Sequence, residues 1–381
     1  MTQSQILFVN TQAILDPRII EVWQDYPQHD WVNYHKINAK WTTSHHQNYL
    51  RVGTNVLPFK NNIVDKLDLA PPKYNPSFNA TFADVTDRRY FDLLESHGDS
   101  EWLVLWSGGI DSTVVLASIL RNAAPGALSR IHVACNRISV YENPEFYFKY
   151  VVPNFKIIDS TNLDWTKDFL KQYYILDGEP ADQLMGGNIS QRMQLENPNG
   201  LIKNCHSDPD ELIRYLAKYT DDDFAQWFYP RWMENINSVD IPIETYHDFF
   251  WWTFFNLTWV ATKIRSKRFT DSNDPEVLRV YLDKFKPWFE SHDYQQWSMR
   301  NNQPGVKYGN HPGEYKLAFK QYIYEFDQNE YYFNFKTKGE SASRIRKESH
   351  DWFCVLEDLT QLSLSRDRER ILELLPAHIM P

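Results

Sequence analysis

The stretch SGGIDS, residues 107 to 112, combines small residues with an acid in a way that suits phosphate chemistry. Ser107, Gly108 and Gly109 have small or absent side chains, so their backbone N–H groups can turn toward an anion at the start of a helix. Asp111 lies in the same stretch, and its carboxylate would repel phosphate unless a divalent cation stood between them. These residue types therefore predict a site for phosphate together with Mg²⁺.

The spacing of this stretch differs from two familiar phosphate-binding motifs. It is neither GxGxxG nor the P-loop pattern, since no lysine follows the glycines. An ordinary Gly-Gly turn between a strand and a helix, with Asp111 as a cap, is the alternative. The ordered run SGGIDS directly after an apolar segment favours nucleotide binding over that turn.

The elements that must position this loop alternate along the chain between residues 102 and 190. Short apolar runs predict strands at 102–106, 131–135, 156–159 and 174–178. Helical periodicity predicts helices from Ser112 to about Asn122, from Pro144, and from about Asp164 to Tyr173. This alternation predicts an α/β fold with a doubly wound parallel sheet and right-handed crossovers. The SGGIDS loop then follows the first strand, where ligands collect in such sheets.

Two motifs together carry a resemblance to a known family. SGGIDS resembles the PP-loop of the N-type ATP pyrophosphatases, which cleave ATP between the α and β phosphates and usually activate a substrate oxygen as an adenylate. LDGEPADQLMGG, residues 176 to 187, resembles the LSGEGADELFGG motif of the synthetase domain of asparagine synthetases, which β-lactam synthetases share. The resemblance covers residues 100–190 well and the helical remainder loosely, and it says little about residues 1–95.

The resemblance implies ATP and Mg²⁺ as cofactors and assigns roles to three acids. Asp111 and Asp182 correspond to the metal ligands of the family. Because loops at the carboxyl ends of neighbouring parallel strands converge, we expect both carboxylates to face one Mg²⁺ across the pyrophosphate. Glu179 stands where the family keeps a glutamate near the acceptor, as proton acceptor for the amine or as an orienting carboxylate. A loop whose acids cap the next helix is the alternative.

The second motif departs from the family pattern at three positions. Asp177 replaces a serine, Pro180 a glycine and Gln183 a glutamate. The lost charge at Gln183 implies that substrate recognition differs from that of asparagine synthetase itself.

The family also uses a lysine from its C-terminal half to neutralise charge that builds on the α-phosphate during adenylation. The stretch YYFNFKTKGESASR, residues 331 to 344, offers Lys336 and Lys338. Lys338 is preferred because a glycine follows it, as in the family's loop. Two solvated lysines on a loop are the alternative.

Adenine in the family lies against the backbone of the first two strands. The expected nucleotide-binding residues are Leu105, Ser107, Gly108, Gly109, Asp111, Ser112, Val133, Cys135 and Gly178.

Composition gives no indication of several other classes of protein. The formal net charge of -10 provides no basic field to attract nucleic acid or an anionic membrane. The first residues lack a secretory signal, so a cytoplasmic protein is expected. The aromatic run at 249–261 is too short and too polar to span a membrane, and it predicts a buried helix. Cys135, Cys205 and Cys354 are too far apart for a zinc motif, which favours three core cysteines.

Changes of texture predict three regions along the 381 residues. Residues 1–95 are expected to form a small accessory region, residues 96–190 the ATP-binding core, and residues 191–381 a large all-α extension that completes the site. Five helical patterns support the last of these regions: DPDELIRYLAKY, YHDFFWWTFFNLTWVATKI, DPEVLRVYLDKFKPWF, GEYKLAFKQYIYEF and RDRERILELL.

The expected function is that of an ATP-dependent ligase that adenylates a carboxylate, releases pyrophosphate, and forms an amide when an amine displaces AMP. Small-molecule carboxylates and amines are the expected partners. Asparagine synthetases begin with a glutaminase domain whose nucleophile is an N-terminal cysteine; here residue 2 is Thr2, which could also serve as a nucleophile. The segment of about 100 residues before the first strand is roughly half as long as that domain in the family, so we expect no glutaminase domain and an amine taken from solution or from a second substrate. A thiolating or nucleobase-modifying enzyme of the same fold is one alternative. A nucleotide-binding regulatory protein without turnover is another.

Overall fold

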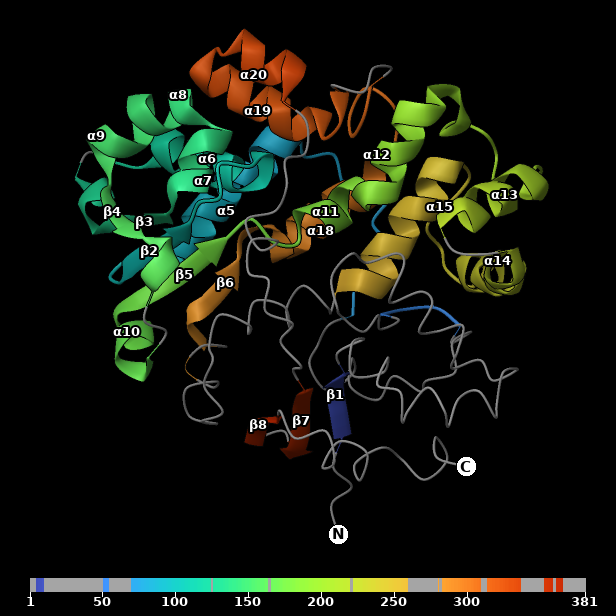
Figure 1. Cartoon of the computed structure of the whole chain (residues 1–381), viewed down its shortest axis with the longest axis horizontal. Helices are drawn as coiled ribbons and strands as arrows, with labels where there is room; N and C mark the ends of the chain where they lie inside the picture. The colour runs from blue at the N-terminus through green and yellow to red at the C-terminus, as the bar shows by residue number, and fades with distance from the viewer. Residues whose placement is uncertain are drawn as a thin grey trace. The chain divides into compact units, whose positions relative to one another are not determined.

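Short runs of apolar residues form a five-stranded parallel sheet in this computed structural model (Figure 1). Its strands are β2 (Glu101–Leu105), β3 (Ile131–Cys135), β4 (Lys156–Asp159), β5 (Tyr173–Asp177) and β6 (Phe285–Pro287). They lie in the order β4-β3-β2-β5-β6, and every neighbouring pair is parallel. All five residues of β3 are buried, as expected for a strand with neighbours on both edges and both faces covered.

The structure describes residues 5–9, 51–54, 70–124, 126–163, 166–219, 222–259, 280, 283–309, 314–336, 353–358 and 361–365. The chain divides into two compact units, each formed by segments far apart in sequence. Residues 72–200 and 280–347 form one, which we call the α/β unit, and it contains the parallel sheet. Residues 1–71, 201–279 and 348–381 form the other, which we call the second unit.

The strand order places a switch point between β2 and β5. The chain runs from β2 outward to β3 and β4 on one side, then returns to β5 and later β6 on the other side of β2. Val104 of β2 is in register with Val133 on one side and Leu176 on the other. In open α/β sheets, ligands bind outside the carboxyl ends of the strands at such a point. The loops after β2 and β5 both lie there.

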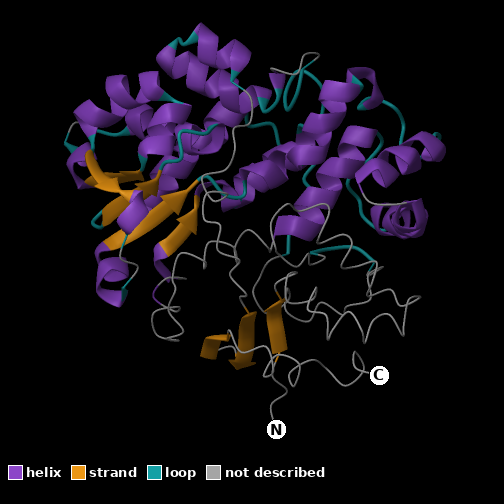
Figure 2. Ribbon diagram, in the orientation of Figure 1, coloured by secondary structure: helices purple, strands orange, loops and turns teal. Residues whose placement is uncertain are grey.

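Helices surround this sheet (Figure 2). The longer helices of the α/β unit are α5 (Phe82–His97), α6 (Ile110–Asn122), α12 (Gly187–Glu196), α18 (His292–Arg300) and α19 (Leu317–Asp327). Its shorter ones are α7 (Arg137–Glu142), α8 (Pro144–Phe146), α9 (Val152–Asn154), α10 (Lys167–Gln172), α11 (Ala181–Met185) and α20 (Glu330–Phe335). Helix α6 packs against both α5 and α19. Residues 114–117 and 119 of α6 are completely buried by these contacts.

The second unit contains helices α13 (Pro209–Tyr219), α14 (Asp222–Asn237) and α15 (Tyr246–Thr253) and a small sheet. That antiparallel sheet has the order β1-β7-β8, with β1 at Gln5–Val9, β7 at Phe353–Asp358 and β8 at Gln361–Ser365. Helix α15 continues as a π-helical turn at Phe254–Thr258, and every residue from 246 to 258 is buried. The predicted buried aromatic helix is therefore confirmed over its described part.

The predicted parallel α/β sheet is confirmed, with two strands correct to the residue and two displaced by one residue. The expectation of an all-α region after residue 190 is wrong at β6, β7 and β8. KFKPWF was assigned to a helix, but Phe285 and Pro287 are buried on either side of the half-buried Lys286. Proline disfavours a helical conformation in the residue before it, and β6 is an edge strand, where proline is tolerated.

The two units also group the chain differently from the three expected regions. Helix α5, from the region expected to be accessory, packs on α6 and α18 within the α/β unit. Strand β6 and helices α18, α19 and α20 belong to that unit as well. The segment from residue 280 to 347 therefore contributes the edge strand of the sheet and three of its helices.

Candidate functional site

The loop between β2 and α6 is closed on itself by two serines. The Ser107 N–H donates to Ser112 Oγ at 3.1 Å, and the two hydroxyl oxygens are also 3.1 Å apart. Ser112 Oγ donates in turn to the carbonyl oxygen of Gly109 at 3.3 Å. These bonds hold residues 107–112 in a compact turn directly before the helix. Ser107 and Ser112 thus shape the loop in addition to any contact with a ligand.

The start of α6 suits an anion. Gly109 is its N-cap residue and has no side chain to cap the N–H groups of the first turn. Gly108 has φ +75°, a conformation that favours glycine. A Cβ atom there would lie 2.1 Å from the Ser139 carbonyl oxygen and 2.7 Å from Glu142 Cβ. The loop therefore lies directly against α7, and only glycine fits at position 108.

The loops after β2 and β5 touch each other at Gly178. A Cβ atom on Gly178 would lie 2.9 Å from both Asp111 Cβ and the Ser112 nitrogen. The missing side chain allows the loop that carries Glu179 and Asp182 to approach the start of α6. The two sequence motifs thus form one surface at the switch point, as their expected positions in the sheet implied.

Asp111 and Asp182 converge on a single cation, the ammonium of Lys316. Lys316 Nζ forms ion pairs with Asp111 Oδ1 and, at 2.7 Å, with Asp182 Oδ1. The Lys316 side chain is 3 % exposed, whereas those of the two aspartates are about 30 % exposed. The carboxylates therefore have access to solvent on one side and the lysine on the other.

Tyr315 adds a neutral donor to this cluster. Its hydroxyl donates to Asp182 Oδ1 at 3.1 Å. Burial raises the pKa of Tyr315 well above its usual value, and the charges of Asp182 and Asp111 reinforce the shift. Burial by itself would lower the pKa of Lys316, but Asp111 and Asp182 outweigh it and the pKa lies above its ordinary value. The lysine is therefore a cation and the tyrosine a neutral phenol at neutral pH.

The backbone at Lys316 is held in a strained conformation. Its φ of 53° and ψ of 45° are left-handed, which costs a residue with a side chain about 1–2 kcal/mol. The next two residues, Leu317 and Ala318, donate their N–H groups to the carbonyl oxygens of Lys307 and Val306 at 3.0 and 2.9 Å. These bonds fix the start of α19 and impose the conformation of Lys316. Strain of this kind clusters at ligand sites.

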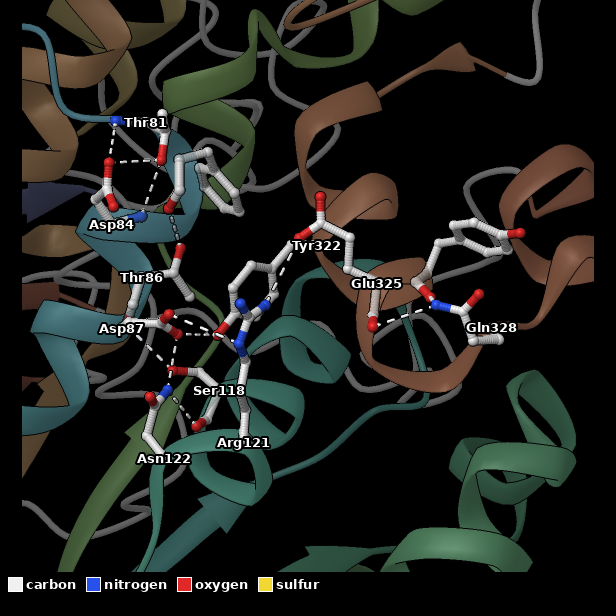
Figure 3. A network of polar contacts seen from close by, with 12 residues as sticks. Thr81, Asp84, Thr86, Asp87, Ser118, Arg121, Asn122, Tyr322, Glu325 and Gln328 are labelled. Atoms are coloured by element: carbon white, nitrogen blue, oxygen red, sulfur yellow. Dashed lines mark hydrogen bonds and ion pairs between the residues drawn. The ribbon is translucent and has the colours of Figure 1, made fainter.

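A polar network anchors α19 to the helices beside it (Figure 3). Tyr322 of α19 and Asn122 of α6 both donate to Asp87 Oδ1 of α5. Arg121 of α6 lies 3.7 Å from Asp87 Oδ2 and 3.6 Å from the carboxylate of Glu325 on α19. Three helices are thus joined through one aspartate, and the lysine at the start of α19 is positioned by the same packing.

Lys336 lies at the edge of the loop. It is the C-cap residue of α20, and its Nζ is paired with the carboxylate of Glu142 and donates to the Glu142 carbonyl oxygen at 3.2 Å. The Glu142 side chain also borders Gly108, since its Cβ atom would lie 2.7 Å from a Cβ atom placed on that glycine. The structure therefore brings Lys336 next to the loop after β2. Lys338, the preferred lysine of the sequence prediction, lies outside the described residues.

Glu179 is held by its backbone on the other side of the site. Its N–H donates to Asp177 Oδ1 at 3.0 Å, and its carbonyl oxygen accepts from the Phe289 N–H at 3.1 Å. Asp177 thus caps the turn after β5. Phe289 follows β6, so the edge strand that the sequence did not predict supports Glu179.

The expected adenine wall is only partly at the strand ends. Leu105 and Cys135 are the last residues of β2 and β3, close to the loop. Val133 is the middle residue of β3, is fully buried, and is paired with neighbours on both sides. Burial raises the pKa of the Cys135 thiol to about 11, so at neutral pH this residue would line the site as a neutral thiol and not as a reactive thiolate.

The donor set fits Mg²⁺ bound to a nucleotide better than Mg²⁺ alone. Among the described residues, no group of three or more histidine, cysteine, aspartate or glutamate side chains could hold a metal ion. Two carboxylates that share one cation are what a magnesium ion uses when phosphate oxygens and water supply the remaining ligands. Asp111 and Asp182 would hold the ion in that arrangement.

The sequence analysis did not identify Lys316 and Tyr315. Both stand in GEYKLAF, which was recognised only as the start of a helical pattern. A lysine before an apolar helix is usually a solvated residue. The sequence does place Tyr315 and Lys316 directly before a helix that is predicted to be buried. That position does not indicate which distant residues the two side chains contact.

Comparisons with known proteins give no family for this chain. No protein-family model, no curated protein and no solved structure matches it. Within the part of the chain that the structure describes, every helix is too short or too polar to traverse a lipid bilayer.

Proposed function

We propose that the protein is an ATP-dependent, AMP-forming amide ligase of the asparagine synthetase type, with the PP-loop at residues 107–112. One observation carries the proposal. The loops after β2 and β5 meet at the switch point of the sheet and direct Asp111 and Asp182 to one cation beside the start of α6. A cation site next to a helix N-terminus suits a metal-bound polyphosphate.

Each group of the site has a task in this reaction. The N–H groups at the start of α6 would face phosphate oxygens, and Asp111 and Asp182 would hold the metal. When bound, Mg²⁺ supplies positive charge that neutralises the polyphosphate and stabilises the leaving pyrophosphate. Lys336, at the edge of the loop, would neutralise charge that develops on the α-phosphate, with Lys338 as the other candidate.

Glu179 would act on the acceptor. Its backbone is held by Asp177 and by the residue after β6, so its position is set on rigid elements. A carboxylate there can accept a proton from the amine that displaces AMP or orient that amine. Gln183, which stands where the family has a glutamate, is buried and leaves this side of the site with one acid fewer.

Two observations weigh against the alternatives. A thiolating enzyme needs a reactive thiolate, and burial raises the pKa of Cys135 to about 11 and that of Cys205 to about 12. A protein that merely binds nucleotide would use two acids for the metal, but it would not need the third acid, Glu179, which the proposal assigns to the acceptor. The presence of Asp111, Asp182 and Glu179 on two adjoining loops supports turnover.

Exchange between ATP and radiolabelled pyrophosphate tests the proposal. The purified protein is incubated with Mg²⁺, ATP, labelled pyrophosphate and one carboxylic acid at a time from a panel. Label should enter ATP only with the acceptor that is adenylated, because reversal of adenylation is the step that incorporates pyrophosphate. Release of ADP and phosphate in place of AMP and pyrophosphate would contradict the proposal.

A further inference from the structure

The ammonium of Lys316 lies where a metal ion shared by Asp111 and Asp182 would lie. It is within ion-pair distance of one oxygen of each carboxylate. The Asp182 oxygen also accepts the Tyr315 hydroxyl. The two aspartates are therefore already neutralised in part, and a dication that approaches them has to compete with a cation of the protein.

Lys316 cannot simply yield its place to a metal ion. Its side chain is 3 % exposed, so an ammonium that lost both carboxylates would be left buried without compensation and beside a dication. Its backbone is fixed at the start of α19 by the bonds of the following residues to residues 306 and 307. Only the side chain can move, and it needs a new anion within its own reach.

A polyphosphate that enters together with the metal supplies that anion. We propose that Lys316 is a built-in counter-ion that keeps the place of the divalent cation between Asp111 and Asp182, so that the metal binds only together with an anionic polyphosphate. The inference rests on the proposed function only for the identity of the polyphosphate. That a metal ion must replace the Lys316 ammonium between Asp111 and Asp182 is inferred from the two ion pairs.

Mn²⁺ in place of Mg²⁺ tests the coupling, because free and protein-bound Mn²⁺ differ in their paramagnetic resonance signal. The intact protein is titrated with Mn²⁺ alone and with Mn²⁺ plus an ATP analogue that has a methylene group between its α and β phosphates. We expect no saturable binding of Mn²⁺ alone in the concentration range in which the analogue and Mn²⁺ bind together. Equally tight binding of Mn²⁺ with and without the analogue would overturn the proposal.

The variant Lys316→Met tests the competition directly, since it removes the charge and keeps an apolar chain of similar length. Its affinity for Mn²⁺ alone should rise at least about tenfold over the wild type, as expected when a charge-assisted contact no longer has to be broken. Adding Asp182→Asn to this variant should abolish the gain. An unchanged affinity in folded Lys316→Met would overturn the proposal.

Lys307→Met is the matched control. Lys307 is also buried, and its Nζ donates to the carbonyl and hydroxyl oxygens of Ser298 and to Asn302. Its Mn²⁺ affinity should equal that of the wild type. The Mn²⁺ titrations without nucleotide test whether Lys316 competes with the metal ion for the two aspartates. Failure of every variant to bind the ATP analogue would count against the proposed function only.

Discussion

A polar network in the second unit and the candidate site of the α/β unit are built from different kinds of polar group. In the second unit, Asn235 is completely buried, accepts from Trp252 Nε1 at 2.9 Å, and donates to the carbonyl oxygens of Val52 and Thr54. Asn256 donates to the Asn235 oxygen at 3.2 Å. In this network, which we call the amide network, neutral donors and acceptors match one another.

In the α/β unit, the Asp111, Asp182 and Lys316 cluster combines two partly exposed acids with a buried base. Burying charges is costly, and neutral groups of similar size often stabilise a fold equally well. The amide network shows that neutral amides can satisfy one another in the interior of this chain. If the charges at the switch point serve a ligand, as proposed, four sets of substitutions should separate the two regions.

The largest expected effect is on catalysis. Asp182→Asn keeps the volume of the side chain and removes one of two charges that hold the metal, so pyrophosphate exchange should fall by about 100-fold or more. Asp111→Asn should behave alike. Because each substitution removes one of the two carboxylates that compensate the buried Lys316 ammonium, the temperature of unfolding measured by calorimetry should also fall, and exchange is therefore compared per folded molecule.

Asp293→Asn is the control for these two variants, because Asp293 forms an ion pair with Arg88 on the surface of the same unit. It should keep the activity of the wild type. An Asp182→Asn protein with full activity at limiting Mg²⁺ would show that the two acids serve the fold and not a metal.

The amide network should show a different pattern. Asn235→Ala removes the acceptor of Trp252 and Asn256, and buried groups left without a partner cost about 1–3 kcal/mol each. The free energy of unfolding should therefore fall by roughly 3 kcal/mol in urea denaturation. Pyrophosphate exchange per folded molecule should be unchanged. A loss of exchange without a loss of stability would contradict the conclusion that the amide network serves the fold alone.

Lys320 should reveal the cost of a buried charge through pH. Burial lowers its pKa to about 8, opposed by Glu314 and assisted by Lys336. Below pH 8 the Lys320 side chain is protonated in both the folded and the unfolded state, so the folded protein bears the full cost of burying the ammonium. Between pH 8 and about 10.5 only the folded state loses this proton, and the free energy of unfolding rises. Lys320→Met should be more stable at pH 7 by on the order of 2 kcal/mol.

This advantage of Lys320→Met should shrink as the pH passes 8. The measurement is the difference in free energy of unfolding between the two proteins from pH 7 to 10. A difference that stays constant over that range would show that Lys320 keeps its proton in the folded protein.

The smallest expected effect separates the two candidate lysines. The variant that removes the catalytic one, Lys336→Met or Lys338→Met, should lower kcat about tenfold and leave KM for ATP nearly unchanged, as for a contact that strengthens in the transition state. The other variant should have the kinetics of the wild type. An equal rise in the KM for ATP in both variants, with kcat unchanged, would assign these lysines to binding of the substrate in its ground state.

Local sequence determined much of the fold around the site. Strands β3 and β4 begin and end at the predicted residues, because a short run of β-branched and apolar residues is a property of the segment itself, whether the strand is buried, as β3 is, or exposed, as most of β4 is. The glycines and acids of the two motifs likewise predicted that Asp111, Glu179 and Asp182 lie where strands give way to helices: Glu179 lies in the turn after β5, and the two aspartates lie in the first turns of α6 and α11. The parallel sheet then required these turns to lie at one edge.

Tertiary structure decided the features that depend on distant partners. Lys316 and Asp111 are 205 residues apart, and Lys336 and Glu142 are 194 residues apart, so no local pattern connects them. Strand β6 has three residues and a proline, too short a pattern to be told from the helix predicted there, and only pairing with β5 makes it a strand. Sequence by itself named the acids of the site, whereas the lysine that balances their charge was chosen by the packing of α19 on α5 and α6.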